Sequence, residues 1–182
     1  LTFVDQDNKL ITQKVICTGE VTTIPLTLTF LPKAVFINAP MTLNLAQFNV
    51  LRNIKETGSP NFTYPNLIIT VGEIKDSTWA YSEHHYTAPD ANIDPGIAMN
   101  NQHFWKLTYG DPELIKMLGK IDYNTTWDAN LLQNGEDSIQ LFYRSNGLEN
   151  WTIYPFYTKN GGSANDKKGT FVISKYLQGE YA

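Results

Sequence analysis

The sequence predicts an all-β protein with little helix, and three observations carry this expectation. Apolar and polar residues alternate with a period of two in nearly every segment. β-Branched and aromatic residues are abundant, and Gly, Pro, Asn and Asp recur between the segments. Short strands with tight turns, rather than strands alternating with helices, favour antiparallel β-sandwiches of immunoglobulin-like type.

The chain divides into two consecutive β-sandwich domains. We expect a small domain over residues 1–54, with strands at 1–4, 9–18, 21–30, 33–37 and 42–46. Residues 55–65 contain Gly58, Pro60 and Pro65, the composition of an exposed linker. Residues 66–182 form the second, immunoglobulin-like domain, with strands expected at 66–73, 78–87, 103–109, 169–174 and 179–181.

One segment of the second domain is ambiguous. Asp111 followed by Pro112 resembles a helix start, and Leu114, Met117 and Leu118 have helical spacing. The alternative is a strand that runs on into residues 120–123. We predict the short helix over residues 111–118 and keep the strand open.

A hairpin over residues 138–157 organises the second domain. Ile139, Leu141 and Tyr143 alternate with Gln140, Phe142 and Arg144, so we expect one set to face a core and the other to meet solvent or a second layer. The polar loop at 145–150 supplies the turn, and the return strand covers 151–157.

Composition excludes several classes of partner. The 182 residues carry a net charge of −4 and only 18% charged residues, so no basic stripe exists to hold nucleic acid or an anionic membrane. No apolar run reaches the roughly 18 residues of a membrane helix. The single Cys17 cannot form an intrachain disulfide, and the composition resembles that of a bacterial protein that is secreted or lies on the cell surface. The first residues lack the pattern of a signal peptide, so the chain reads as a piece of a longer protein.

The only cluster that resembles metal ligands is Glu83, His84 and His85, with His103 further along the chain. On a strand, Glu83 and His85 share a face and His84 points away, so at most two of the three reach one ion. We favour the interpretation that these histidines form hydrogen bonds between strands, and we expect no metal and no cofactor.

Catalytic motifs are absent from the sequence. It has no H-E-x-x-H helix and no G-x-S-x-G elbow, and Cys17 lies in a β-branched run that is typical of an inert thiol. We therefore expect no catalytic residue and no enzymatic activity in this chain.

Tryptophans are the remaining candidates for a functional role. On alternating strands, Trp79, Trp105 and Trp151 usually fill a core, although such residues also form sugar-stacking platforms. Trp127 lies in the polar run NTTWDAN, so we expect it to be exposed. It is our candidate surface contact residue.

Short sequence motifs along the chain resemble the C-terminal region of large secreted aminopeptidase-like zinc proteases, the gluzincins, of gliding and polysaccharide-degrading bacteria. In the front half these motifs are ITQKV at 11–15, AVFIN at 34–38 and LNLA at 43–46. In the back half they are YSEHH at 81–85, APD at 88–90, HFW at 103–105, LFYR at 141–144, WTIYP at 151–155 and GEY at 179–181.

The resemblance implies a non-catalytic accessory region. In such proteins the zinc motif lies in an upstream catalytic domain, and this sequence lacks every zinc ligand of that motif. The implied partner is the upstream catalytic domain of the same protein, together with a cell-surface glycan or protein. A carbohydrate-binding or adhesive β-sandwich attached to a surface enzyme is the alternative function.

Overall fold

The computed structural model describes residues 1–62, 66–90, 96–133, 135–161, 163 and 166–182. These residues form thirteen strands in three antiparallel sheets, and no helix occurs among them. Within this described part there is accordingly no helix long and apolar enough to cross a membrane. The predicted all-β class is confirmed.

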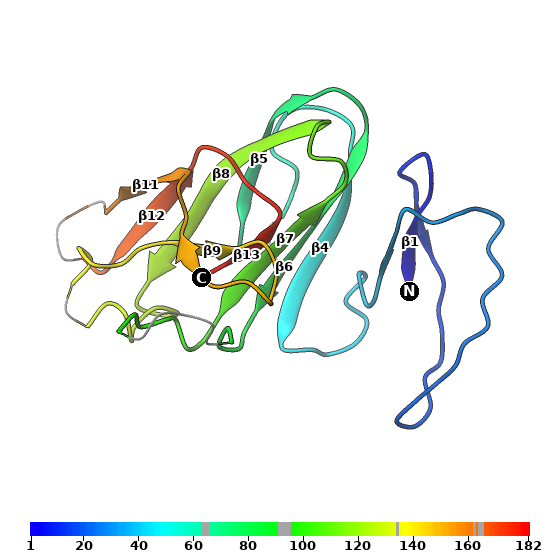
Figure 1. Cartoon of the computed structure of the whole chain (residues 1–182), viewed down its shortest axis with the longest axis horizontal. Coiled ribbons are helices and arrows are strands. Elements are labelled where there is room, and N and C mark those ends of the chain that lie inside the picture. The colour runs from blue at the N-terminus through cyan, green and yellow to red at the C-terminus, as the bar shows by residue number, and fades with distance from the viewer. Residues whose placement is uncertain (63–65, 91–95, 134, 162, 164–165) are drawn as a thin grey trace.

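Two large sheets face each other, and a small third sheet lies beside one of them (Figure 1). The small sheet has the order β2-β1-β3, with β1 (Thr2–Val4), β2 (Leu10–Thr12) and β3 (Ala34–Phe36). The six-stranded sheet has the order β10-β9-β13-β7-β6-β4, with β4 (Gln47–Ile54), β6 (Thr78–His85), β7 (Phe104–Tyr109), β9 (Phe142–Arg144), β10 (Thr152–Ile153) and β13 (Gly179–Tyr181). The four-stranded sheet has the order β11-β12-β8-β5, with β5 (Ile68–Ile74), β8 (Ile115–Asn124), β11 (Tyr157–Asn160) and β12 (Lys168–Ile173).

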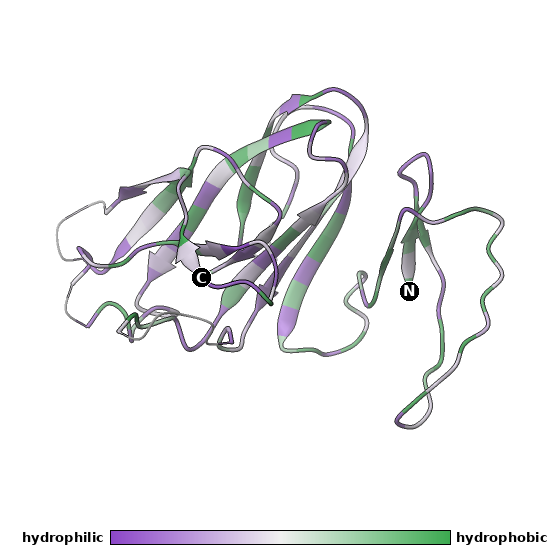
Figure 2. Cartoon of the chain, in the orientation of Figure 1, coloured by the Kyte–Doolittle hydropathy of each residue, from purple (hydrophilic) through white to green (hydrophobic). Residues whose placement is uncertain are grey.

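The main core lies between the two large sheets. Along β8, buried and exposed residues alternate without interruption, with Ile115, Met117 and Ile121 among the buried ones. Figure 2 shows bands of apolar green and polar purple along β8, and the exposed Leu118 is an apolar exception to the burial pattern. Leu107 on β7 and Ile173 on β12 come from the two opposing sheets, and both side chains are fully buried in this core. Each such side chain contributes about 1.5–3 kcal/mol on burial, so this core is the main source of stability.

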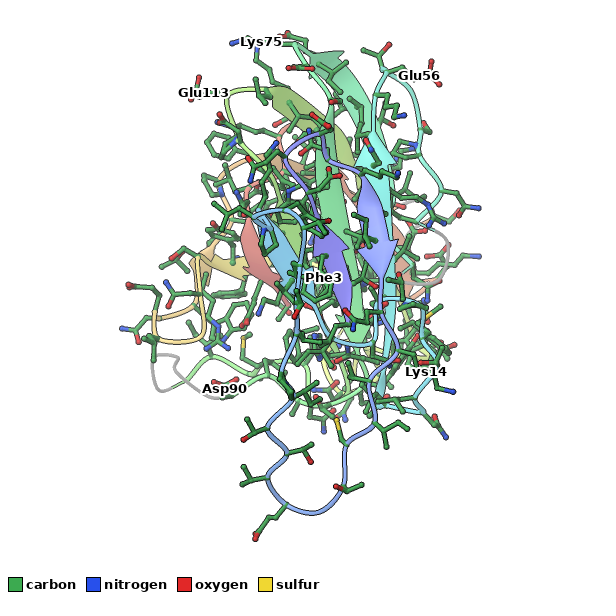
Figure 3. All side chains as sticks on the ribbon, turned by 90° about the vertical axis from the view of Figure 1, so that its right-hand side faces the viewer. Phe3, Lys14, Glu56, Lys75, Asp90 and Glu113 are labelled. Carbon is green, nitrogen blue, oxygen red and sulfur yellow. The ribbon has the colours of Figure 1, made fainter. Side chains whose placement is uncertain are left out.

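The N-terminal sheet packs on the outer face of the six-stranded sheet. Trp79 and Tyr81 alternate with the inward-facing Ala80 on β6 and form a second cluster with Val4 and Leu51. Figure 3 looks onto this side, with Phe3 near its centre. Because Trp79 and Tyr81 are only 8% and 6% exposed, this sheet covers large aromatic surfaces that would otherwise face water.

The predicted helix over residues 111–118 is wrong, and the strand alternative is right. Asp111 does begin a turn, since its side chain accepts a hydrogen bond from the Glu113 amide at 2.9 Å. The chain then enters β8 at Ile115 and pairs with β5. Met117 fits a period of two with Ile115 and a helical spacing with Leu114, and sheet pairing decides between them.

The front half also departs from several expectations. Residues 21–30 alternate in exposure as a strand does, but no ladder forms there, and residues 42–46 are not a strand either. The sequence reading missed β4, which pairs with β6 from Gln47↔His85 to Ile54↔Thr78. The division into domains at 1–54 and 66–182 stays a prediction. The structure adds that β4, at the end of the first range, belongs to the six-stranded sheet.

The hairpin within residues 138–157 is present but short. Tyr143 pairs with Thr152, and Phe142 pairs with Ile153. Tyr157 instead begins β11 in the opposite sheet. The alternation left the side of Arg144 open, and the structure buries this side chain, which is only 2% exposed.

Candidate functional site

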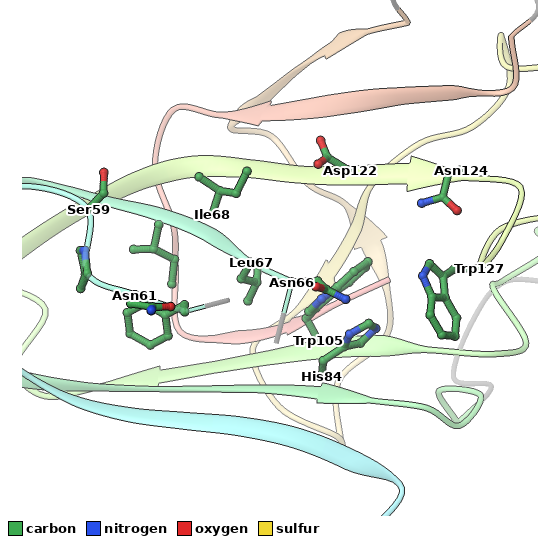
Figure 4. A pocket seen from close by; sticks show the side chains of 13 residues that line it. Ser59, Asn61, Asn66, Leu67, Ile68, His84, Trp105, Asp122, Asn124 and Trp127 are labelled. Atoms are coloured by element: carbon green, nitrogen blue, oxygen red, sulfur yellow. The ribbon is translucent and has the colours of Figure 1, made fainter. Parts of the chain in front are cut away.

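A pocket opens where the edge of the four-stranded sheet is incomplete. Among the described residues, β5 pairs with β8 only as far as Ile68↔Lys120, whereas β8 continues to Asn124 and pairs with β12 along that end. The resulting cavity of about 660 Å³ reaches across to the inner face of the six-stranded sheet. We call it the His84 pocket, after the histidine that β6 contributes to it (Figure 4).

His84 occupies the inner face of β6, two positions beyond the buried Ser82, and is completely buried. Its ring stacks on the Trp105 indole, with 4.8 Å between the centroids and 17° between the planes. Burial, together with the neighbouring His103 and His85, lowers the pKa of His84 to about 3. His84 is therefore neutral at physiological pH.

Three buried side chains form a hydrogen-bonded row that we call the histidine relay: Asp128, His103 and His84. The His84 Nε2 lies 2.7 Å from the His103 Nδ1, and the His103 Nε2 lies 3.0 Å from the Asp128 Oδ1. None of the three is more than 5% exposed. The relay therefore links β6, the start of β7 and the loop after β8 through buried side chains.

The Asp128 carboxylate is held by further donors. Its Oδ1 accepts a hydrogen bond from the Asn100 side-chain amide at 2.5 Å, and its Oδ2 accepts one from the Asn124 backbone amide at 2.8 Å. The Asn100 Oδ1 in turn accepts from the backbone amide of His103 at 3.2 Å. This network fixes the position of His103, the central member of the relay.

Trp127 forms one wall of the pocket and is half-buried, where the sequence predicted exposure. Its ring lies 5.2 Å from that of Tyr86, 5.9 Å from His103 and 6.2 Å from His84. In Figure 4, Trp127 from the loop after β8 and His84 from β6 border the same space. Its proposed contact role stays a prediction, and the structure adds that the residue lines a cavity.

The other walls combine apolar and polar groups. Phe62 and Leu67 are buried members of the main core, and they continue the apolar floor beside Trp105. Asn61, Asn66, Asp122 and Asn124 bring amide and carboxylate groups from the 59–62 segment, the start of β5 and the end of β8. No lysine or arginine lines the pocket among the described residues.

The structure separates the residues that had been grouped as metal ligands. Glu83 and His85 share the outer face of β6, as the strand pattern predicted, and the His85 ring stacks on Phe104 at 4.5 Å. His84 points the other way and meets His103. Among the residues that the structure describes, no group of three His, Cys, Asp or Glu side chains has the arrangement of a metal site.

Sequence reasoning placed His84 and His103 in one group but missed Asp128 and Asn100. The signal for Asp128 was its place in the polar run after Trp127, whereas Asn100 lies 28 residues earlier in the sequence. Such residues are more often turn formers than partners of histidines, so the sequence alone did not single them out.

Comparison with known proteins gives no relative from which a role could be transferred. No protein-family model matches this chain, and no curated protein and no solved structure does so. The resemblance to gluzincin C-terminal regions stays a prediction.

Proposed function

We propose that this chain is a non-catalytic β-sandwich module that binds carbohydrate in the His84 pocket. The observation that supports this best is the half-buried Trp127 indole, which lines a cavity beside amide and carboxylate side chains. A sugar ring has apolar C–H faces and hydroxyl groups around its edge. It therefore needs an aromatic surface and, next to it, groups that both donate and accept hydrogen bonds.

The polar groups of the pocket suit a hydroxylated ligand. The Asn124 side-chain oxygen accepts from the Thr126 backbone amide at 2.8 Å, so its amide group is the end that serves a ligand as donor. Asp122 accepts from the Thr170 hydroxyl at 2.7 Å and has further acceptor capacity as a carboxylate. Since no described cation lines the pocket, we propose neutral rather than acidic sugars as ligands.

The wider setting of the module is proposed from the sequence resemblance. We propose an accessory region of a secreted or surface zinc-metallopeptidase-like protein, with an upstream catalytic domain as its partner. An immunoglobulin-like topology and the division into 1–54, 55–65 and 66–182 belong to the same proposal. Binding of a separately produced catalytic domain, together with inertness toward sugars, would favour the accessory role over the carbohydrate-binding one.

A glycan array with the purified chain tests the carbohydrate proposal. We expect binding to neutral glycans, and Trp127→Ala should lower the affinity at least about tenfold because an aromatic contact at the centre of a site is lost. Trp127→Phe should retain part of the binding. Phe156→Ala is the matched control, because Phe156 is a half-exposed aromatic residue that does not line the pocket.

Two results would contradict the proposal. One is a folded protein that binds no glycan. The other is binding that Trp127→Ala leaves unchanged while the circular dichroism spectrum shows an intact fold. Turnover of a glycan or peptide by the purified chain would contradict its non-catalytic part.

A further inference from the structure

One atom of His84, a residue that lines the pocket, has no partner among the described residues. The His84 Nδ1 is buried and makes no hydrogen bond with any described residue, although the Nε2 of the same ring is bonded to His103. Buried ring nitrogens are nearly always paired, so an unpaired one in a cavity wall points to a ligand. Figure 4 shows the His84 ring projecting from β6 into the space between Trp105 and Trp127.

The direction of the hydrogen bonds along the relay follows from its Asp128 end. Both carboxylate oxygens of Asp128 already accept hydrogen bonds from Asn100 and Asn124. A carboxylate has no hydrogen to give, so the His103 Nε2 must be the donor toward it.

The rest of the relay is then determined. At a pH of about 8, where imidazoles are usually neutral, a ring carries a single N–H, so a His103 that donates from Nε2 accepts at Nδ1. His84 must donate from its Nε2 to that nitrogen at 2.7 Å. Because His84 is neutral as well, its Nδ1 is left with a lone pair and no hydrogen.

We propose that the histidine relay fixes the His84 Nδ1 as a hydrogen-bond acceptor at the floor of the pocket, so that a ligand must present an O–H or N–H donor there. Taking a sugar as the ligand rests on the proposed function, and the donor is then a hydroxyl or an N-acetyl amide. Asp128 and His103 do not touch the ligand. They act as positioning residues that determine which His84 nitrogen is free to bind.

The tautomer is measured directly by NMR of protein labelled with nitrogen-15 in histidine, at a pH of about 8, where imidazoles are usually neutral. We expect His84 to carry its proton on Nε2 and none on Nδ1. A proton on the His84 Nδ1 would overturn the inference, whether or not any sugar binds.

Asp128→Ala tests the positioning role, because it removes the acceptor that holds the His103 proton on Nε2. The His103 Nδ1 can then donate as well as accept, so part of the His84 proton should appear on Nδ1. Asp122→Ala is the matched control, since Asp122 lines the pocket but lies outside the relay, and it should keep the wild-type tautomer. An unchanged His84 tautomer in folded Asp128→Ala would contradict the positioning role. Should that variant fail to fold, the wild-type tautomer and the ligand probes below decide.

Two small probes test the donor requirement without a known ligand. Ethylene glycol offers hydroxyl donors, and 1,2-dimethoxyethane has the same oxygen spacing without them. We expect glycol to shift the His84 Nδ1 resonance and the ether to leave it in place. Equal responses to both probes, or no response to either, would overturn the requirement.

Glycosides separate this inference from the proposed function. For a methyl glycoside that binds, replacing the contacting hydroxyl by hydrogen should weaken binding about 10-fold to 100-fold, because the buried acceptor loses its partner. If no glycoside binds while glycol shifts the Nδ1 resonance, the carbohydrate proposal fails and the inference stands. If a glycoside binds without changing that resonance, the inference fails and the carbohydrate proposal stands.

Discussion

Arg144 and Glu180 lie opposite each other on the paired strands β9 and β13 and form an ion pair of 2.6 Å, with both side chains buried. A second bond runs from the Arg144 Nε to the same carboxylate at 2.7 Å. The guanidinium also lies 4.5 Å above the Trp151 ring and reaches the exposed Asp90 at 2.9 Å. One arginine thus joins the hairpin, the last strand and the loop before residue 91.

Arg144→Met should destabilise the fold strongly, because it leaves the Glu180 carboxylate buried without a cation. Removing one partner of a buried pair costs about 3–5 kcal/mol. Asp90→Asn should cost no more than about 1 kcal/mol, since that carboxylate is exposed. Urea unfolding measures both. The double change Arg144→Met with Glu180→Leu should recover part of the loss, and equal costs for Arg144→Met and Asp90→Asn would contradict this ranking.

Acid should destabilise the protein partly through His84. Its pKa is about 3 in the folded protein against 6.5 for the ordinary side chain, so the unfolded chain binds a proton that the folded one does not. The stability that neutral His84 provides is complete above pH 6.5 and is lost as the pH falls from there toward 3. Between pH 7 and 5 this amounts to about 2 kcal/mol.

Unfolding free energies of His84→Gln and the wild type at the two pH values check this expectation. His84→Gln starts from a lower stability, but its loss between pH 7 and 5 should be smaller by about 2 kcal/mol. His85→Gln is the matched control, because it removes a histidine from the same strand and leaves His84 in place. Equal acid losses for wild type and His84→Gln would show that the buried histidine does not take up a proton on unfolding.

Gly119 should be irreplaceable in β8. A Cβ atom at this position would lie 1.8 Å from the Ile68 carbonyl oxygen and 3.1 Å from the Tyr176 ring, so backbone would have to move. Gly119→Ala should therefore open the pairing of β5 with β8 and cost at least about 1–3 kcal/mol. Thermal unfolding measures the loss. Gly147→Ala, whose nearest neighbour would lie at 3.8 Å, should leave the midpoint nearly unchanged, and similar losses for both variants would refute the crowding at Gly119.

The sequence predicts β5, β6, β7 and β12 closely because hydrophobic alternation and turn residues coincide at their ends. Residues 21–30 show the limit of this reasoning. Their alternation is a property of the chain itself, whereas a ladder needs a partner strand that the local sequence does not specify. The opposite error occurred at β4, whose sequence QFNVLRNI places polar residues beside the buried Val50 and Leu51.

The candidate site was predictable only in part, for a similar reason. His84 and His103 are 19 residues apart and are brought together by the pairing of β6 with β7, which adjacent strands commonly make. Asp128 joins them from the loop after β8, in the opposite sheet, and its position depends on how the two sheets pack. The environment of Arg144 stayed open because alternation cannot distinguish solvent from a buried ion pair.

The N-terminal sheet lies outside the main core, and the proposed boundary at residues 55–65 follows β4. Removing residues 1–46 deletes β1, β2 and β3 but keeps β4 beside β6 and leaves the main core intact. This fragment should fold with lower stability, and Trp79 should become exposed, which a red shift of tryptophan fluorescence reports. Polar substitution of Leu51 and Tyr81 should then improve its solubility, because both would lie on the uncovered face.

A chain that begins at Asn66 should be less stable still. It also loses Val50 and Ile54 from the main core and turns β6 into an edge strand. Residues 1–54 alone should not fold, because β4 then lacks the strand with which it pairs along its whole length. The free energies of unfolding of the fragments that begin at Gln47 and at Asn66 test this expectation. Equal values would show that β4 contributes little and that the domain boundary does lie at residues 55–65.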